Sequence, residues 1–128
     1  MTNLMQTENM ELDLLVANKV LAILKISGVI DLDTSEDVLI GSRKVIEDYN
    51  SHCIVFDVAD VSYVSSAGVG VFMSLLETME KNRGQVIFVH LNDAFRRVLM
   101  LLGFMRYFPA FATLDEAQGY LMSEPELV

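Results

Sequence analysis

Two neighbouring serines carry the hydroxyl groups with the most unusual setting in this sequence. Ser65 and Ser66 come directly after an apolar run and before small residues, in the stretch VSSAGVG at positions 64–70. A serine hydroxyl can attack a substrate, cap the first turn of a helix, or accept a phosphate group. The groups expected around Ser66 decide among these three kinds of chemistry.

A nucleophilic serine needs a histidine base held by an acid, and the sequence contains only His52 and His90. His52 precedes an apolar strand, so we expect it at the edge of the sheet opposite to Ser66. His90 ends a strand, but neither a glycine–serine elbow nor an oxyanion loop accompanies it. We therefore predict no catalytic residues and interpret both histidines as ordinary residues at strand ends.

Bound metals and cofactors are also not predicted. The His, Cys, Asp and Glu residues do not have the spacing of metal ligands. The chain lacks a glycine-rich phosphate loop with its lysine, and the two glycines of Gly68-Val69-Gly70 alone are a weak signal. The chemistry of this chain is therefore expected to lie in a docking surface or a modified side chain.

Hydrophobic periodicity predicts alternating strands and helices, which begin with a hairpin around Asn18-Lys19. The expected strands cover 12–17, 20–26, 54–58, 86–91 and 105–108, and the expected helices cover 33–49, 66–82, 92–102 and 113–122. This β-β-α-β-α-β-α-β-α order indicates an α/β fold with a mixed, mostly parallel sheet of about four to five strands and about four helices. We expect one domain over residues 10–122, with residues 1–9 and 123–128 as flexible tails.

The helix expected to begin at Ser66 has two unlike faces when it is projected at about 100° per residue. Its core-facing side holds Gly68, Phe72, Leu75 and Met79. Its outer side holds Ser66, Gly70, Ser74, Glu77 and Lys81. Val69 and Met73 flank the outer side and are expected to form a partly exposed apolar rim. Because Gly70 has no side chain, another protein could approach Ser66 closely, and this combination predicts a docking surface.

Two interpretations of Ser66 remain open. Its hydroxyl could accept a hydrogen bond from a backbone N–H in the first turn and serve as a helix cap. Alternatively, it could be phosphorylated, which would place about −1.5 to −2 charges at the positive end of the helix dipole. The domain itself would tolerate that phosphate, whereas a closely docked protein would be repelled. Phosphorylation could therefore switch binding off without unfolding the domain.

Composition and charge exclude several classes of function. The formal net charge is −9, from 18 acidic and 9 basic residues, and it would repel the phosphates of nucleic acids. The sequence has no uncharged apolar run of about 18 residues, so no membrane span is predicted. Its first residues lack the basic and apolar regions of a signal peptide. With Cys53 as the single cysteine, we expect a cytoplasmic protein.

Several segments, in this order and spacing, resemble those of bacterial STAS domain proteins, specifically the single-domain anti-sigma factor antagonists. They are GVID at 28–31, DVSYVSSAGVG at 60–70, FRRVL at 95–99 and LGF at 102–104, followed by Phe108 and by LDEA at 114–117. The second segment is the most specific one, and the resemblance covers about residues 10–122. It implies the STAS fold and a binding module without catalytic activity.

The resemblance also implies a mechanism. In this family the unphosphorylated protein binds an anti-sigma factor that is also an ATP-dependent serine kinase, and the sigma factor is thereby freed. Phosphorylation by the kinase ends the binding, and a metal-dependent phosphatase restores it. The phosphorylated serine corresponds to Ser66, two residues before Gly68, and a frequently acidic family position corresponds to Ser65. The expected partner-binding residues are Asp31, Ser65, Ser66, Val69, Gly70, Met73 and Ser74.

Other functions and roles remain open. The chain could instead be a scaffold STAS protein of a signalling assembly, or a soluble STAS subunit of a lipid or anion transport system. Asp31 could be a turn or cap residue after Gly28 rather than a contact residue. Arg96 and Arg97 are interpreted as a solvated helix face rather than a phosphate site.

Overall fold

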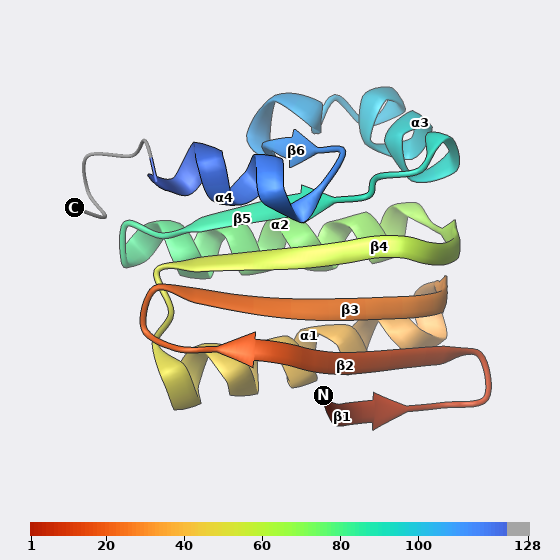
Figure 1. Cartoon of the computed structure of the whole chain (residues 1–128). Coiled ribbons are helices and arrows are strands. Elements are labelled where there is room, and N and C mark those ends of the chain that lie inside the picture. Colours follow the sequence, from red (N-terminus) through yellow and green to blue (C-terminus); the bar gives the residue numbers. More distant parts are fainter. Residues whose placement is uncertain (123–128) are drawn as a thin grey trace.

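A mixed β-sheet with helices on both faces organises the chain (Figure 1). The computed structural model describes residues 1–122. The strands are β1 (Thr2–Gln6), β2 (Met10–Ala17), β3 (Leu21–Ile30), β4 (Cys53–Val64), β5 (Gln85–Val89) and β6 (Ala110–Phe111). The helices are α1 (Leu32–Tyr49), α2 (Ser66–Lys81), α3 (Asp93–Leu101) and α4 (Leu114–Met122), with a short 3-10 helix η1 (Met105–Tyr107). The predicted α/β class is confirmed.

The strands lie in the sheet in the same order as in the sequence, from β1 to β6. The first three form antiparallel pairs, which confirms the predicted hairpin of β2 and β3. From β3 onward every neighbouring pair is parallel. The carboxyl ends of β3, β4 and β5 therefore share one edge of the sheet, and α1, α2 and α3 all begin there.

The sheet has six strands rather than four to five, because residues 2–6 form β1 and not a flexible tail. The polar composition of this segment suggested fraying, but Leu4 and Met5 pack against the main core. In addition, Asn3 Nδ2 donates a hydrogen bond to Asp13 Oδ1 at 2.9 Å. The expected tail at 123–128 lies outside the described residues.

A second difference concerns the chain after α3. The strand expected over 105–108 is wrong, since Met105–Tyr107 forms η1 and the short strand follows at Ala110–Phe111. Phe108 is buried in the main core and fixes the end of η1. Pro109, whose carbonyl accepts a hydrogen bond from Phe88 N at 3.0 Å, then leads into the parallel pairing of β6 with β5.

Two hydrophobic cores hold the sheet between its helices. The larger one lies under α1 and α2, where Phe72 packs edge-on against Phe56 and Phe88 with ring centroids 5.0 Å apart in both pairs. The smaller one lies under α4 on the opposite face and includes Val55 and Ile87. Because β4 and β5 are packed from both sides, the edge from which α2 begins is held firmly.

Candidate functional site

The stretch with the two serines lies at the carboxyl end of β4. Ile30 ends β3 and Val64 ends β4, and the two residues are paired neighbours in the sheet. Ser65 N donates a hydrogen bond to Ile30 O at 2.9 Å, which ties the beginning of α2 to the end of β3. The serines are therefore held by two neighbouring strands of the sheet.

Ser65, and not Ser66, is the cap of helix α2. Its backbone is extended, and its Oγ accepts a hydrogen bond from Gly68 N at 3.1 Å. Ser66 is the first residue inside the helix and is exposed. Among residues 1–122, its hydroxyl has no hydrogen-bond partner. The cap interpretation of Ser66 is thus wrong by one position, and the hydroxyl of Ser66 faces solvent.

The two glycines of the stretch have different surroundings. A Cβ at Gly68 would lie 2.8 Å from the carbonyl oxygen of Ile30 and 2.8 Å from its Cγ2. Gly68 therefore allows α2 to pack tightly on β3, which agrees with its predicted place on the core-facing side of the helix. A Cβ at Gly70 would meet no atom within 4 Å, and Gly70 is exposed. No packing contact requires a glycine at position 70, and the missing side chain leaves the surface beside Ser66 open.

The apolar rim predicted beside Ser66 is only partly present. Val69 is completely buried in the main core, so its assignment to the docking surface is wrong. The reason is that α2 packs against α1 as well as against the sheet, which buries a wider arc of the helix than one contact would. Met73 and Ser74 are half-buried, and Ser74 Oγ accepts a hydrogen bond from Arg43 Nη2 at 3.3 Å.

Asp31 lies at the same edge, at the carboxyl end of β3, and caps α1. Its Oδ1 accepts hydrogen bonds from the backbone N–H groups of Asp33 (3.0 Å) and Thr34 (3.1 Å). Thr34 Oγ1 in turn accepts from Asp31 N at 3.0 Å, which completes a capping box. The half-buried carboxylate of Asp31 therefore has a structural role. Asp31 lies one strand away from Ser66.

Two exposed apolar side chains at this edge were missed by the sequence analysis. Leu32 is 78% exposed at the start of α1, and Tyr63 is 55% exposed near the end of β4. Each stands within three residues of Asp31 or Ser66, where a helix begins or a strand ends. Periodicity is a poor guide at such ends, so only the fold identifies these residues as candidates for an apolar rim.

His90 forms a pair with Asp57, which the sequence analysis also missed. His90 follows β5 in a left-handed conformation (φ 57°), and its Nδ1 lies 3.1 Å from Asp57 Oδ1. Among residues 1–122, no hydrogen bond joins either histidine to Ser66. The arrangement needed for a nucleophilic serine is thus not assembled in the described part of the chain.

Two further ionisable side chains of the sheet, Lys25 and Cys53, are engaged or buried. The hydrogen bond and the charge of Asp60, whose Oδ2 lies 3.0 Å from Lys25 Nζ, raise the pKa of Lys25. Burial raises the pKa of the Cys53 thiol to about 12, so this group is not a reactive thiolate at neutral pH. Within residues 1–122, no cluster of three His, Cys, Asp or Glu side chains is placed to hold a metal ion.

Comparison with known proteins agrees with the observed fold. The STAS domain family matches residues 12–117, and the chain therefore belongs to the STAS domain family. This match contains every residue of the candidate site. None of the helices among residues 1–122 is long and apolar enough to cross a membrane.

Several solved structures are similar to this chain. The unphosphorylated anti-sigma factor antagonist SpoIIAA is 18% identical, with a TM-score of 0.76 over 88% of this chain and 97% of its own. An anti-sigma factor antagonist from Mycobacterium paratuberculosis is 25% identical, with a TM-score of 0.75 over 88% and 95%. A sulfate transporter family protein from Wolinella succinogenes is 21% identical, with a TM-score of 0.70 over 84% and 88%.

Proposed function

We propose that this chain is a cytoplasmic anti-sigma factor antagonist that is switched at Ser66 and has no catalytic activity of its own. In the unphosphorylated form it binds an anti-sigma factor that is also a serine kinase, and a sigma factor is freed. Phosphorylation of Ser66 ends the binding, and a metal-dependent phosphatase restores it. The proposal rests on the family and on one observation, the solvent-facing hydroxyl of Ser66 beside a serine whose hydroxyl is engaged.

The geometry at the start of α2 supports a binding switch rather than a folding switch. A phosphate on Ser66 would lie at the first turn of a 16-residue helix, where the dipole favours negative charge. The side chain is exposed, so the modification displaces no packed group. A partner lying over the open surface at Gly70 would instead meet the added charge directly.

The surrounding residues define the surface that such a partner would cover. We assign Ser65, Ser66, Gly70, Met73 and Ser74 to it. Asp31 joins this surface at the neighbouring strand end, together with Leu32 and Tyr63. The exposed leucine and tyrosine provide the apolar area that the buried Val69 does not.

The decisive experiment is incubation with the cognate kinase and ATP, followed by mass spectrometry of the intact protein and its peptides. We expect a single phosphate on Ser66 in the wild type and in Ser65→Asp, and none in Ser66→Ala. Ser66→Asp should bind the kinase at least about tenfold more weakly than Ser66→Ala. Phosphate at another residue, or equal binding of the two variants, contradicts the proposal.

A second candidate function is a STAS subunit that contacts a transport protein, which the similarity to the sulfate transporter family protein favours. The same open edge could then contact a transporter instead of a kinase. Affinity capture with the wild type and with Ser66→Asp separates the two functions. Recovery of a transporter component equally by both variants would favour transport, whereas a kinase recovered only by the wild type favours the antagonist.

A further inference from the structure

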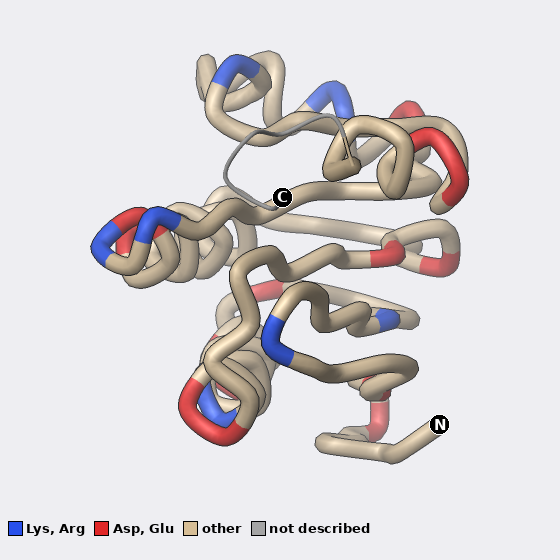
Figure 2. The backbone as a smooth tube through the Cα atoms, turned by 60° about the vertical axis from the view of Figure 1, so that its left-hand side comes forward, with Lys and Arg blue, Asp and Glu red and all other residues tan. Residues whose placement is uncertain are grey.

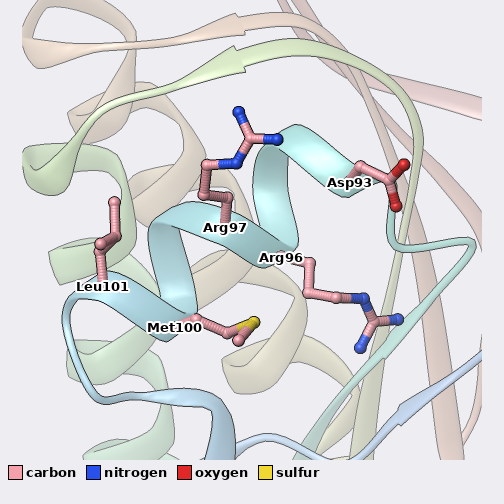
Figure 3. A pocket seen from close by; sticks show the side chains of 5 residues that line it. All are labelled: Asp93, Arg96, Arg97, Met100 and Leu101. Carbon is pink, nitrogen blue, oxygen red and sulfur yellow. The ribbon is translucent and has the colours of Figure 1, made fainter.

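Helix α3 presents arginine and apolar side chains together on its outer face (Figure 3). Arg96, Arg97, Met100 and Leu101, with Asp93, line an open hollow of about 460 Å³. Met100 is 63% exposed and Leu101 is 80% exposed. We call Arg96, Arg97, Met100 and Leu101 the α3 patch. Apolar side chains so exposed beside charged ones are typical of contact surfaces.

The two arginines of the α3 patch have no acidic partner within the described chain. Among residues 1–122, the basic members of the ion pairs are Lys25, Lys44 and His90 only. Asp93 begins the same helix, but it forms no ion pair with either arginine. The whole chain has 18 acidic and 9 basic residues, so these two adjacent arginines form a basic site in an acidic protein. Figure 2 shows how sparse the basic positions are along the backbone.

The first half of α1 presents the opposite combination on its outer face. Leu32, Glu36 and Ile40 follow one another at intervals of four residues, and Asp33 is exposed beside them. Leu32 is 78% exposed and Ile40 is 53% exposed. We call Leu32, Asp33, Glu36 and Ile40 the α1 patch. Its carboxylates form no ion pair among residues 1–122, whereas Lys44 and Asp48 pair further along the helix.

The geometry points to self-association: we propose that the α3 patch of one copy of this chain docks on the α1 patch of a second copy. Arginines would then meet carboxylates, and Met100 and Leu101 would meet Leu32 and Ile40. Charge complementarity of this kind sets the orientation of a contact, and the apolar side chains supply the buried area.

Two separate copies are needed because each patch is exposed in a single chain. Helix α2 packs against both α1 and α3, so the two patches belong to helices on either side of it. A two-fold arrangement can therefore use the contact twice, with the α3 patch of each copy on the α1 patch of the other. Away from the patches the two acidic copies repel each other, which restricts association to this pairing.

Charge reversal in each patch tests the proposal by sedimentation at concentrations up to about 1 mM. We expect the wild type to reach masses above the 14.3 kDa of one chain. Arg96→Glu/Arg97→Glu and Asp33→Lys/Glu36→Lys should each weaken association at least about tenfold. Circular dichroism checks that both variants are folded, as expected for substitutions of exposed side chains.

Mixing the two variants provides the discriminating measurement. In a dimer that contains one copy of each variant, both contacts again join opposite charges. Association in the mixture should therefore return to within about threefold of the wild type. The control Lys19→Glu/Lys81→Glu makes the same change in net charge as Arg96→Glu/Arg97→Glu, at exposed positions outside both patches. It should associate less than threefold more weakly than the wild type. The proposal is overturned if the wild type stays monomeric, even if α3 then binds a different partner. It is also overturned if the mixture stays monomeric or if the control loses association as strongly as the patch variants.

Discussion

Ser65 and Ser66 differ by one position in the chain, yet their hydroxyls have different surroundings. The hydroxyl of Ser65 accepts a hydrogen bond from Gly68 N in the first turn of α2, and that of Ser66 faces solvent. If Ser66 is the switch residue that we propose, Ser65 takes a family position that is frequently acidic, and an aspartate there could form the same cap. On that proposal, Ser65 preserves the structural part of the position without its charge.

Substitution of the two serines should affect stability unequally. Ser65→Ala removes the cap and should lower the free energy of unfolding by about 1 kcal/mol. Ser66→Ala removes an exposed hydroxyl and should change it by less than about 0.5 kcal/mol. Urea denaturation measures both values, with Ser65→Asp as the variant that should retain the cap. A larger loss in Ser66→Ala than in Ser65→Ala would show that the cap has been assigned to the wrong serine.

The two glycines of the same stretch should also respond in opposite directions. Gly68→Ala places a methyl group 2.8 Å from the Ile30 carbonyl oxygen and should destabilise the protein by about 1–3 kcal/mol. Gly70→Ala meets no atom within 4 Å and should stabilise the helix by up to about 1 kcal/mol. Thermal unfolding of both variants checks the difference in sign, and stabilisation by Gly68→Ala would contradict the tight packing of α2.

At the scale of elements, long periodic segments could be predicted from the sequence, whereas short ones could not. The helices α1 and α2 were predicted to within one residue at each end, because their apolar residues recur at helical spacing over several turns. β1 was missed since its five residues are mostly polar and depend on pairing with β2. The burial of Val69 was missed for a similar reason, because it depends on how α1 packs against α2.

Strand β1 should contribute measurably to stability although it is short. Deletion of residues 1–6 removes the packing of Leu4 and Met5 and leaves Asp13 without the hydrogen bond from Asn3. We expect a loss of about 2–4 kcal/mol in the free energy of unfolding, of the order found for removal of partly buried apolar side chains. Thr2→Ala is a suitable control, since Thr2 is exposed. An unchanged midpoint of urea denaturation after the deletion would mean that β1 is not part of the folded domain.

At the scale of the whole molecule, the net charge of −9 sets how stability depends on salt. Repulsion among carboxylates destabilises the compact state, and raising ionic strength from about 0.01 M to 0.15 M shortens the screening length from about 30 Å to 8 Å. We expect the melting temperature to rise by a few degrees, equivalent to about 1 kcal/mol. A fall on adding salt would instead indicate that attractive ion pairs dominate.

The ion pair between Lys25 and Asp60 gives a separate dependence on pH. The pKa of Lys25 in the folded protein is raised above its ordinary value of 10.5. The stabilising contribution of the ion pair is therefore complete below pH 10.5 and is lost as the pH rises through this raised pKa. Because both side chains are partly exposed, that contribution is at most about 1 kcal/mol. The stability difference between the wild type and Lys25→Met should therefore shrink at alkaline pH. A difference that grows with pH would contradict this sign.

The cap formed by Ser65 has a consequence for how a modifying enzyme would select its target. A kinase that meets the folded chain finds two adjacent serines, but only one of them offers a hydroxyl that is not already bonded within the described chain. The substrate's own fold thus discriminates between them, and the enzyme needs no contact that distinguishes one serine from the next. Regioselectivity would be lost in the unfolded chain, where both hydroxyls are equally accessible.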